Sequence, residues 1–243
     1  KNNQENICQL ELDNAEYENN RIQEEINALY DIFTREIAAQ KVVGFDSNFE
    51  QYELYLRLVD SEGKWRMASY FMPMVNEIKM TVEIDLYVLN KFADMLRGGM
   101  LEKMQYAINL GKDILSSAQH FNEFENALKK IKQYASAKIY IEIPNKDDID
   151  TAVLVGFHQR LRSLGFGFGL DHFGFDAKSI ERLSAVNPDY VKIPAANLID
   201  FLGGEASEQR SWFEAMMMSR GVKIIATGVE NDEQKQNLQN LQI

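Results

Sequence analysis

Short apolar runs alternate with longer amphipathic stretches along most of the chain, and this alternation predicts its fold class. From residue 41 onward, runs rich in β-branched and aromatic side chains indicate strands. The stretches between them have the apolar spacing of helices. A strand followed by a helix, repeated about every 25–35 residues, predicts an α/β fold whose parallel sheet closes into a barrel. An open, doubly wound sheet is the alternative.

The pattern also predicts where the elements lie. Three glycines at residues 165, 167 and 169 alternate along a strand instead of opening a helix, so they do not predict a phosphate-binding loop. Strands are expected at residues 41–45, 52–59, 105–110, 138–143, 167–170, 190–193 and 223–227, and helices at 83–97, 112–134, 147–164, 176–186, 207–220 and 231–241.

The first 40 residues follow a different pattern, because they are polar, contain no Gly or Pro and predict a helix. Apolar positions spaced by three and four run from Leu12 to Phe33, with Asn19 among them, as in a coiled-coil seam. We expect residues 1–24 to form a helical linker and dimerising coiled coil that carries a signal from an upstream domain. Residues 25–243 are expected to form the barrel domain. One amphipathic helix folded onto the barrel is the alternative for the linker.

Charge and cysteine content narrow the classes of partner and compartment. The 26 Lys and Arg against 37 Asp and Glu give a net charge of −11, which argues against duplex nucleic acid because that binding relies on cationic contacts with phosphates. The single Cys8 excludes an internal disulfide and a Cys-rich zinc site. With no long apolar run and no signal peptide, we expect a cytoplasmic domain, either free or as the cytoplasmic part of a membrane-bound protein.

Polar residues stand at the predicted strand ends, where a β/α barrel carries its functional groups. Acidic and amide side chains at successive strand ends are typical of an oxygen-rich site for Mg²⁺ or Mn²⁺, which polarises a phosphodiester. Each residue alone is better explained as a solvated strand end, an ion pair or a helix cap, so the spacing of the whole set carries the prediction. The set comprises Glu53, Arg57, Asn109, Glu142, Asp171, His172, Lys192, Thr227 and Glu230.

These segments together resemble the EAL domain family. Residues 53–57, Glu-Leu-Tyr-Leu-Arg, resemble the signature in which Glu-Ala-Leu is followed by Leu and Arg. The segments around Asp171, Lys192 and Thr227 resemble the family's Asp-Asp-Phe-Gly loop, Tyr-Leu-Lys-Ile-Asp strand and Ala-Glu-Gly-Val-Glu strand. The resemblance runs from about residue 25 to 243 and implies a modified (β/α)8 TIM-like barrel preceded by an N-terminal helix. We expect the chain to stop before the family's last strand.

The family binds cyclic-di-GMP across the barrel mouth, where two divalent ions activate the water that opens the ring to pGpG. By resemblance, Glu53, Arg57 and Asp171 contact the ligand. Lys192 matches the lysine that holds or activates the water, here a vestigial catalytic residue, and Glu230 is a supporting residue. The metal ligands implied by the resemblance are Glu53, Asn109, Glu142 and Asp171, with His172 as a candidate substitute.

Several positions depart from the family pattern. His172 stands where the family has a second Asp, and Thr227 where it has a Glu that helps to hold the metal centre. Asn145 replaces a Glu that steadies the loop after Glu142, and Tyr55 adds bulk near the ligand floor. We therefore expect one Mg²⁺ or Mn²⁺ site rather than two, with slower chemistry as a firmer consequence than lost binding.

Three functions remain open. The first is a degenerate EAL domain that acts as a cyclic-di-GMP receptor and signalling module with little or no hydrolysis, working with a homodimer partner, an upstream domain or a protein partner. The second is an active or slow phosphodiesterase that produces pGpG. The third is a nucleotide-free protein-interaction module. The intact Glu53 and Arg57 favour the first over the third, and His172 and Thr227 disfavour the second.

Overall fold

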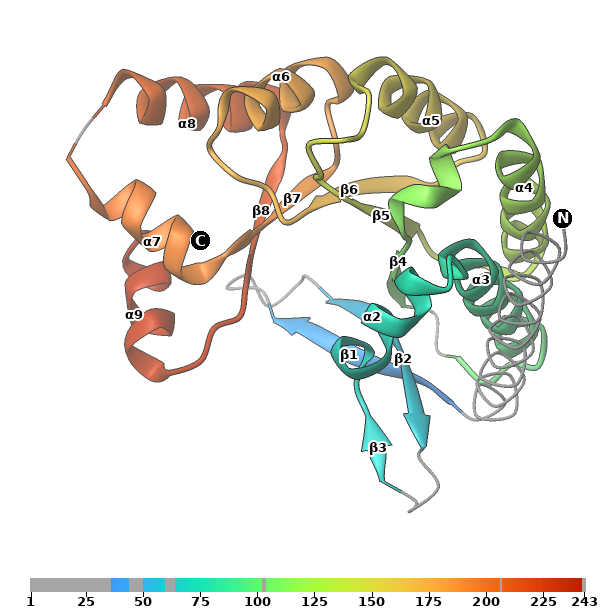
Figure 1. Cartoon of the computed structure of the whole chain (residues 1–243). Coiled ribbons are helices and arrows are strands. Elements are labelled where there is room, and N and C mark those ends of the chain that lie inside the picture. The colour runs from blue at the N-terminus through green and yellow to red at the C-terminus, as the bar shows by residue number, and fades with distance from the viewer. Residues whose placement is uncertain (1–35, 44–49, 60–63, 102–103, 206, 242–243) are drawn as a thin grey trace, which may run out of the picture. The chain divides into compact units, whose positions relative to one another are not determined.

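A computed structural model describes residues 36–43, 50–59, 64–101, 104–205 and 207–241 of the chain (Figure 1). The chain divides into two units, one of residues 1–38 and 56–80, the other of residues 39–55 and 81–243. The coiled coil predicted for residues 1–24, together with the helix that follows it to residue 33, lies outside the described residues. That prediction, and with it the domain boundary at residue 24, stays a prediction.

The described part of the first unit is a short hairpin followed by a helix. The end of β2 (Glu50–Val59) pairs antiparallel with β3 (Trp65–Arg66). Helix α2 (Ala68–Glu77) then buries Phe71 and Val75. The sequence pattern did not predict α2 because Pro73 lies inside it, and a proline removes a backbone donor from the helix interior.

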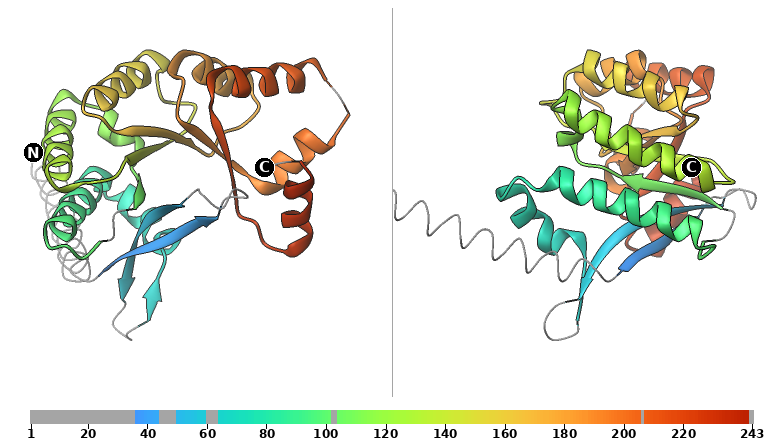
Figure 2. Two further views of the ribbon diagram at one scale, coloured as in Figure 1. Left: turned by 180° about the vertical axis from the view of Figure 1, so that it is seen from behind. Right: turned by 90° about the vertical axis from the view of Figure 1, so that its right-hand side faces the viewer.

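The second unit is built on a parallel sheet. The strands follow the order β1, β2, β4, β5, β6, β7, β8, and each neighbouring pair from β2 to β8 is parallel. The sheet curls, and α3, α4, α5 and α6 lie along its convex side (Figures 1 and 2). The strands are β1 (Glu36–Val43), β4 (Gln105–Asn109), β5 (Ile139–Pro144), β6 (Gly167–Asp171), β7 (Tyr190–Pro194) and β8 (Lys223–Thr227).

Most helices of this unit begin at a residue whose side chain caps the helix N-terminus. A Ser, Asp or Asn side chain accepts a backbone N–H at the start of α4, α5, α6, α8 and α9, which satisfies donors that the first turn leaves free. Helix α3 packs on α4, α5 on α6 and α7 on α9. The bounds are α3 (Thr81–Arg97), η1 (Lys112–Leu115), α4 (Ala118–Tyr134), α5 (Thr151–Ser163), α6 (Ala177–Val186), α7 (Ala195–Gly203), α8 (Glu208–Arg220) and α9 (Asp232–Asn240).

Three sequence predictions need correction. Residues 36–40 were expected to be helical but belong to β1, because pairing beside β2 overrides the helical preference of Glu, Ala and Gln. The helix expected over 112–134 is divided into η1 and α4, because Ser117 caps a new helix. Helix α7 was missed, since its nine residues directly follow a strand and form too short a periodic segment to stand out.

The core of the second unit lies between the sheet and its helices. Phe92, Leu128 and Phe157 project from α3, α4 and α5 and are buried, as are Ile108 and Phe168 on β4 and β6. The rings of Phe157 and Phe168 meet edge to face with centroids 6.2 Å apart, an arrangement that aromatic quadrupoles favour. None of the helices in the described part of the chain is long and apolar enough to cross a lipid bilayer.

A buried histidine in this core makes stability depend on pH. His158 is 6% exposed, its ring centroid lies 5.3 Å from that of Phe168, and its Nε2 has no hydrogen-bond partner among the described residues. Burial and then the Arg162 charge lower the pKa of His158, while Asp189 opposes them weakly. The folded state therefore binds fewer protons at this site than the unfolded state does, and the contribution to stability is lost as the pH falls through the ordinary histidine range.

The change His158→Phe should reduce this pH dependence, because it removes the titrating group and keeps an aromatic ring beside Phe168. Urea unfolding at about pH 7.5 and at about pH 5.5 should give a smaller loss of unfolding free energy in the variant than in the parent. An equal loss in both proteins would show that His158 is not the group that titrates.

Candidate functional site

Four strands bring polar side chains together, Asn109 from the carboxyl end of β4 and the others from within β2, β5 and β7. Lys192 Nζ on β7 lies 2.6 Å from Glu53 Oε1 on β2 and 2.9 Å from Glu142 Oε2 on β5. Asn109 at the end of β4 donates from Nδ2 to the same Glu53 oxygen at 2.5 Å. The side chains of Lys192, Glu53 and Glu142 are 4%, 8% and 1% exposed. We call Glu53, Asn109, Glu142 and Lys192 the Lys192 cluster.

The curl of the sheet is what joins this cluster. Asn109 and Glu142 are register partners on adjacent strands, so the sheet alone places them side by side. Glu53 and Lys192 lie on strands separated by β4, β5 and β6 in the sheet order, and only curvature lets their side chains touch. Within β2, residues 51, 53 and 55 share one face because side chains alternate along a strand.

Tyr190 and Gln51 form a buried layer against the cluster, and neither was predicted. The Tyr190 hydroxyl donates to Glu142 Oε1 at 2.6 Å and accepts from Gln51 Nε2 at 3.2 Å. A Cβ atom at Gly169 would lie only 2.4 Å from the Tyr190 ring, so this position must lack a side chain. Gly167 makes the same room for the Tyr140 ring. The alternating glycines were the signal in the sequence that large neighbours fill this side of β6.

Burial and charge compete within the cluster. Burial raises the pKa of Glu142 to about 7, with Lys192 opposing the shift and Glu53 adding to it. Burial alone lowers the pKa of Lys192, but the carboxylates of Glu142, Glu53 and Asp171 together raise it above its ordinary value. Burial also raises the pKa of Tyr55, and the nearby Glu53 adds to the shift. Lys192 is thus the cation that stabilises ionised carboxylates in this interior.

Asp171 ends β6 and is engaged by its neighbour. The His172 backbone N–H donates to Asp171 Oδ1 at 2.7 Å, and His172 Nδ1 lies 3.1 Å from Oδ2. Burial raises the pKa of Asp171, but the hydrogen bonds from His172 and the Lys192 charge outweigh it and lower the pKa overall. Asp171 in turn raises the pKa of His172. His172 has φ 54° and a side chain that is 67% exposed, so most of its ring faces solvent.

The other predicted site residues are not joined to the cluster by the hydrogen bonds of the described residues. The Asn145 side chain bonds to Ser179 and Arg182. Thr227 ends β8 opposite Pro194, and Glu230 is an exposed residue whose backbone N–H donates to Gln234. Arg57 belongs to the first unit, and its role remains a prediction.

The oxygen atoms of Glu53, Asn109, Glu142 and Asp171 fit the chemistry of a hard divalent ion. Their present arrangement is centred on the Lys192 ammonium, which bridges two of the carboxylates. In the part of the chain that the structure describes, no group of three or more His, Cys, Asp or Glu side chains is arranged to hold a metal ion. Binding an ion there would require the ammonium to move away from Glu53.

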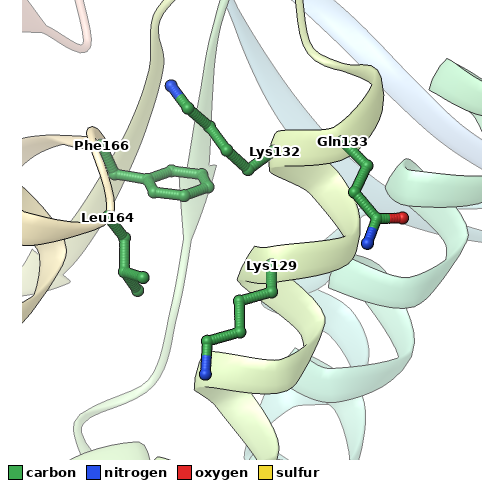
Figure 3. Close-up of a pocket in the computed structure, with 5 residues that line it drawn as sticks. All are labelled: Lys129, Lys132, Gln133, Leu164 and Phe166. Atoms are coloured by element: carbon green, nitrogen blue, oxygen red, sulfur yellow. The ribbon is translucent and has the colours of Figure 1, made fainter.

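A shallow pocket lies at the other end of the strands (Figure 3). Its residues come from the second half of α4 and from the turn before β6, so it borders the amino ends of the strands. None of its lining residues belongs to the Lys192 cluster, so the pocket is separate from it. The lining residues are Lys129, Lys132, Gln133, Leu164 and Phe166.

Removing the central cation should destabilise the protein strongly. Lys192→Met leaves Glu53 and Glu142 buried without their counter-charge, which should lower the unfolding free energy by about 3–5 kcal/mol at neutral pH. The difference in unfolding free energy between variant and parent should shrink on acidification. A buried carboxylate whose pKa is raised in the folded state takes up a proton there, and the neutral form is less costly to bury. Urea unfolding at several pH values measures both effects.

A matched control removes an exposed lysine. Lys129 pairs with Glu125 at 2.8 Å on the surface of α4, and Lys129→Met should change the unfolding free energy by no more than about 1 kcal/mol. Similar losses in the two variants would contradict a special role for Lys192.

Comparisons with known proteins agree with this fold. Solved structures with TM-scores of 0.71, 0.66 and 0.65 are Vibrio cholerae LapD S helix-GGDEF-EAL bound to c-di-GMP, the Xanthomonas citri FimX EAL domain in complex with c-diGMP, and an EAL domain protein from Listeria monocytogenes EGD-e. Their identities are 19%, 18% and 19%, over 91%, 91% and 88% of this chain. The matches span 55%, 89% and 87% of those chains, so this chain covers about half of the solved S helix-GGDEF-EAL chain of LapD.

The curated relatives match over a short segment only. The Streptococcus pneumoniae septation ring formation regulator EzrA is 88% identical over 43 residues, which is 18% of this chain and 8% of that protein. The EAL domain model, by contrast, matches residues 36–243. The predicted α/β fold, a modified TIM-like barrel, is confirmed, and the chain belongs to the EAL domain family.

Proposed function

We propose that this chain is a cyclic-di-GMP receptor and signalling module with little or no hydrolysis. The observation that carries the proposal is the Lys192 cluster. Its four members are the residues that the family resemblance assigns to the barrel mouth on β2, β4, β5 and β7, and they form one buried, hydrogen-bonded group. The complexes of LapD and FimX with this dinucleotide support the choice of ligand.

The proposed lack of hydrolysis rests on the position where a second metal ion would bind. Cleavage of a phosphodiester by two ions needs ligands for both, because one ion assists the attacking oxygen and the other the leaving oxygen. His172 and Thr227 stand where active members carry carboxylates. The His172 ring is held by Asp171 and lies mostly in solvent, which supports binding without efficient cleavage.

A single Mg²⁺ or Mn²⁺ is the cofactor that fits this proposal. Glu53, Asn109, Glu142 and Asp171 would hold it, and when bound it would supply positive charge for a phosphate of the ligand. Lys192 now pairs with Glu53 and Glu142, so the ion would bind with the ammonium displaced from Glu53.

The signal would pass through the segment before the barrel. We propose that residues 1–24 join the module to a second copy or to an upstream signalling domain, and that it works in the cytoplasm. The helix and GGDEF domain that precede the EAL domain in LapD support such an arrangement. A slow phosphodiesterase is the second candidate, favoured by the contact of His172 with Asp171, since an imidazole beside a carboxylate can serve as a metal ligand.

Calorimetric titration of cyclic-di-GMP into the protein with Ca²⁺ present tests the receptor function. We expect saturable binding with one dinucleotide per chain, unchanged in the surface control Lys129→Met. Turnover in Mg²⁺ or Mn²⁺, followed by chromatography of pGpG, should be absent or slow. If two independent methods detect no binding at high ligand concentration, the receptor and phosphodiesterase functions are both wrong.

Restoring the two missing carboxylates should raise turnover. The double change His172→Asp with Thr227→Glu returns the ligands of the second ion, and we expect hydrolysis at least about tenfold faster than in the parent. The same assay on each single change is the control, because one carboxylate alone restores only part of the site. An unchanged rate in the double variant would place the defect at Asn145 or Tyr55 instead.

A further inference from the structure

Helix α6 carries a buried cation without a carboxylate partner among the described residues. Arg182 is 1% exposed. Its guanidinium donates to Asn145 Oδ1 at 2.8 Å, to the Ile149 carbonyl and, at 3.5 Å, to the Asp147 carbonyl. Its Nε has no partner in the described part of the chain. A buried charge that is met only by neutral oxygens is costly, so its contacts need to be well ordered.

All three acceptors lie in one segment, residues 145–149, which we call the mouth loop because it follows the carboxyl end of β5. Arg182 reaches the loop from its buried side. On the exposed side, Lys178 donates to the Asp147 carbonyl and Lys112 pairs with Asp148. Exposed contacts contribute little, so the buried guanidinium is the strongest of these three side-chain contacts to the loop.

The mouth loop leads directly to the candidate site. The Asn145 backbone N–H donates to the Asp171 carbonyl at 2.7 Å. The Asn145 side chain donates to Ser179 Oγ at 2.7 Å, and Ser179 Oγ donates to Asp176 Oδ2 at 2.6 Å. One chain of hydrogen bonds therefore joins Arg182, the mouth loop, the end of β6 and the start of α6.

We propose that Arg182 is a positioning residue for the barrel mouth. Through Asn145 it fixes the mouth loop and the backbone of Asp171, and so sets the geometry in which the mouth receives a ligand. Its hydrogen bonds go to the loop and not to the Lys192 cluster, so it acts through other groups. The part of this inference that concerns the ligand rests on the proposed receptor function, and the part that concerns the loop stands without it.

Residue 145 gives the inference a second consequence. The guanidinium donates directly to the Asn145 side-chain oxygen, so a carboxylate of the same size would face it and form a buried ion pair. Asn145→Asp also loses the hydrogen bond to Ser179, a cost that does not depend on Arg182. The coupling between positions 145 and 182 therefore measures the charge contact separately from that cost.

Hydrogen exchange tests the anchoring. Arg182→Met keeps much of the side-chain length and removes the donors, and amide protection at residues 145 and 149 should fall at least about tenfold. Protection of Ile141 and Ile143 in β5 should not change. An equal loss throughout β5 would indicate general destabilisation, and no loss in the loop would show that Arg182 anchors nothing; either result overturns the inference. If Arg182→Met does not fold, Asn145→Ala removes the same link at a half-buried position.

A double-mutant cycle tests the charge contact. Asn145→Asp changes the equilibrium constant for unfolding, and this change is measured with Arg182 present and in the Arg182→Met background. The increase in that constant should be at least about tenfold smaller when Arg182 is present. The matched control is Arg160→Met, since Arg160 pairs with Glu125 on the surface at 2.8 Å and should show no coupling to residue 145. Additive effects at positions 145 and 182 would overturn the proposed contact.

Titration with cyclic-di-GMP tests the consequence for the site. The dissociation constant should rise at least about tenfold in Arg182→Met and stay unchanged in Arg160→Met. A released loop with unchanged affinity would overturn the positioning role. Absence of binding in the parent would defeat the proposed receptor function, while the exchange experiment would still decide whether Arg182 anchors the loop.

Discussion

The contact of Lys192 with Glu53 and Glu142 is the interaction on which the second unit of this protein depends. It joins strands that the sheet order keeps apart, so it forms only when the sheet is curled. A lysine between two carboxylates satisfies buried groups that would be strongly unfavourable alone. The same contact therefore closes the curl from inside and assembles the polar end of the barrel.

The layer of side chains around this contact follows from the same constraint. A buried polar group needs a hydrogen-bond partner, and Tyr190 supplies one to Glu142 while Gln51 supplies one to Tyr190. The tyrosine ring needs space, and Gly169 on the neighbouring strand leaves it open. The polar interior is thus built from pairs of residues far apart in the sequence, and a change in one member leaves the other unsatisfied.

Ligand binding and bond cleavage place different demands on such a site. In the buried cluster one ammonium lies between two carboxylates, so Lys192 offsets part of their negative charge. In the function we propose, cleavage would need further negative charge at the mouth to hold a second metal, which His172 and Thr227 would not supply. Asp171 stands between these two regions, with its carboxylate held by His172 and its carbonyl held by the mouth loop. Its placement therefore depends on residues behind the site as well as on those within it.

The amino-acid sequence by itself determined most strand and helix positions after residue 50, apart from β3, α2 and α7, because apolar periodicity and capping residues are local signals. It also placed Glu53, Asn109, Glu142 and Lys192 at strand ends, and their spacing indicated the family. Only the tertiary structure decided that Lys192 lies between two carboxylates, that Tyr190 supports Glu142 and that Arg182 holds Asn145. These contacts join residues 37 to 139 positions apart in the sequence. They form only when the curled sheet and its helices pack as one unit, so no local pattern can specify them.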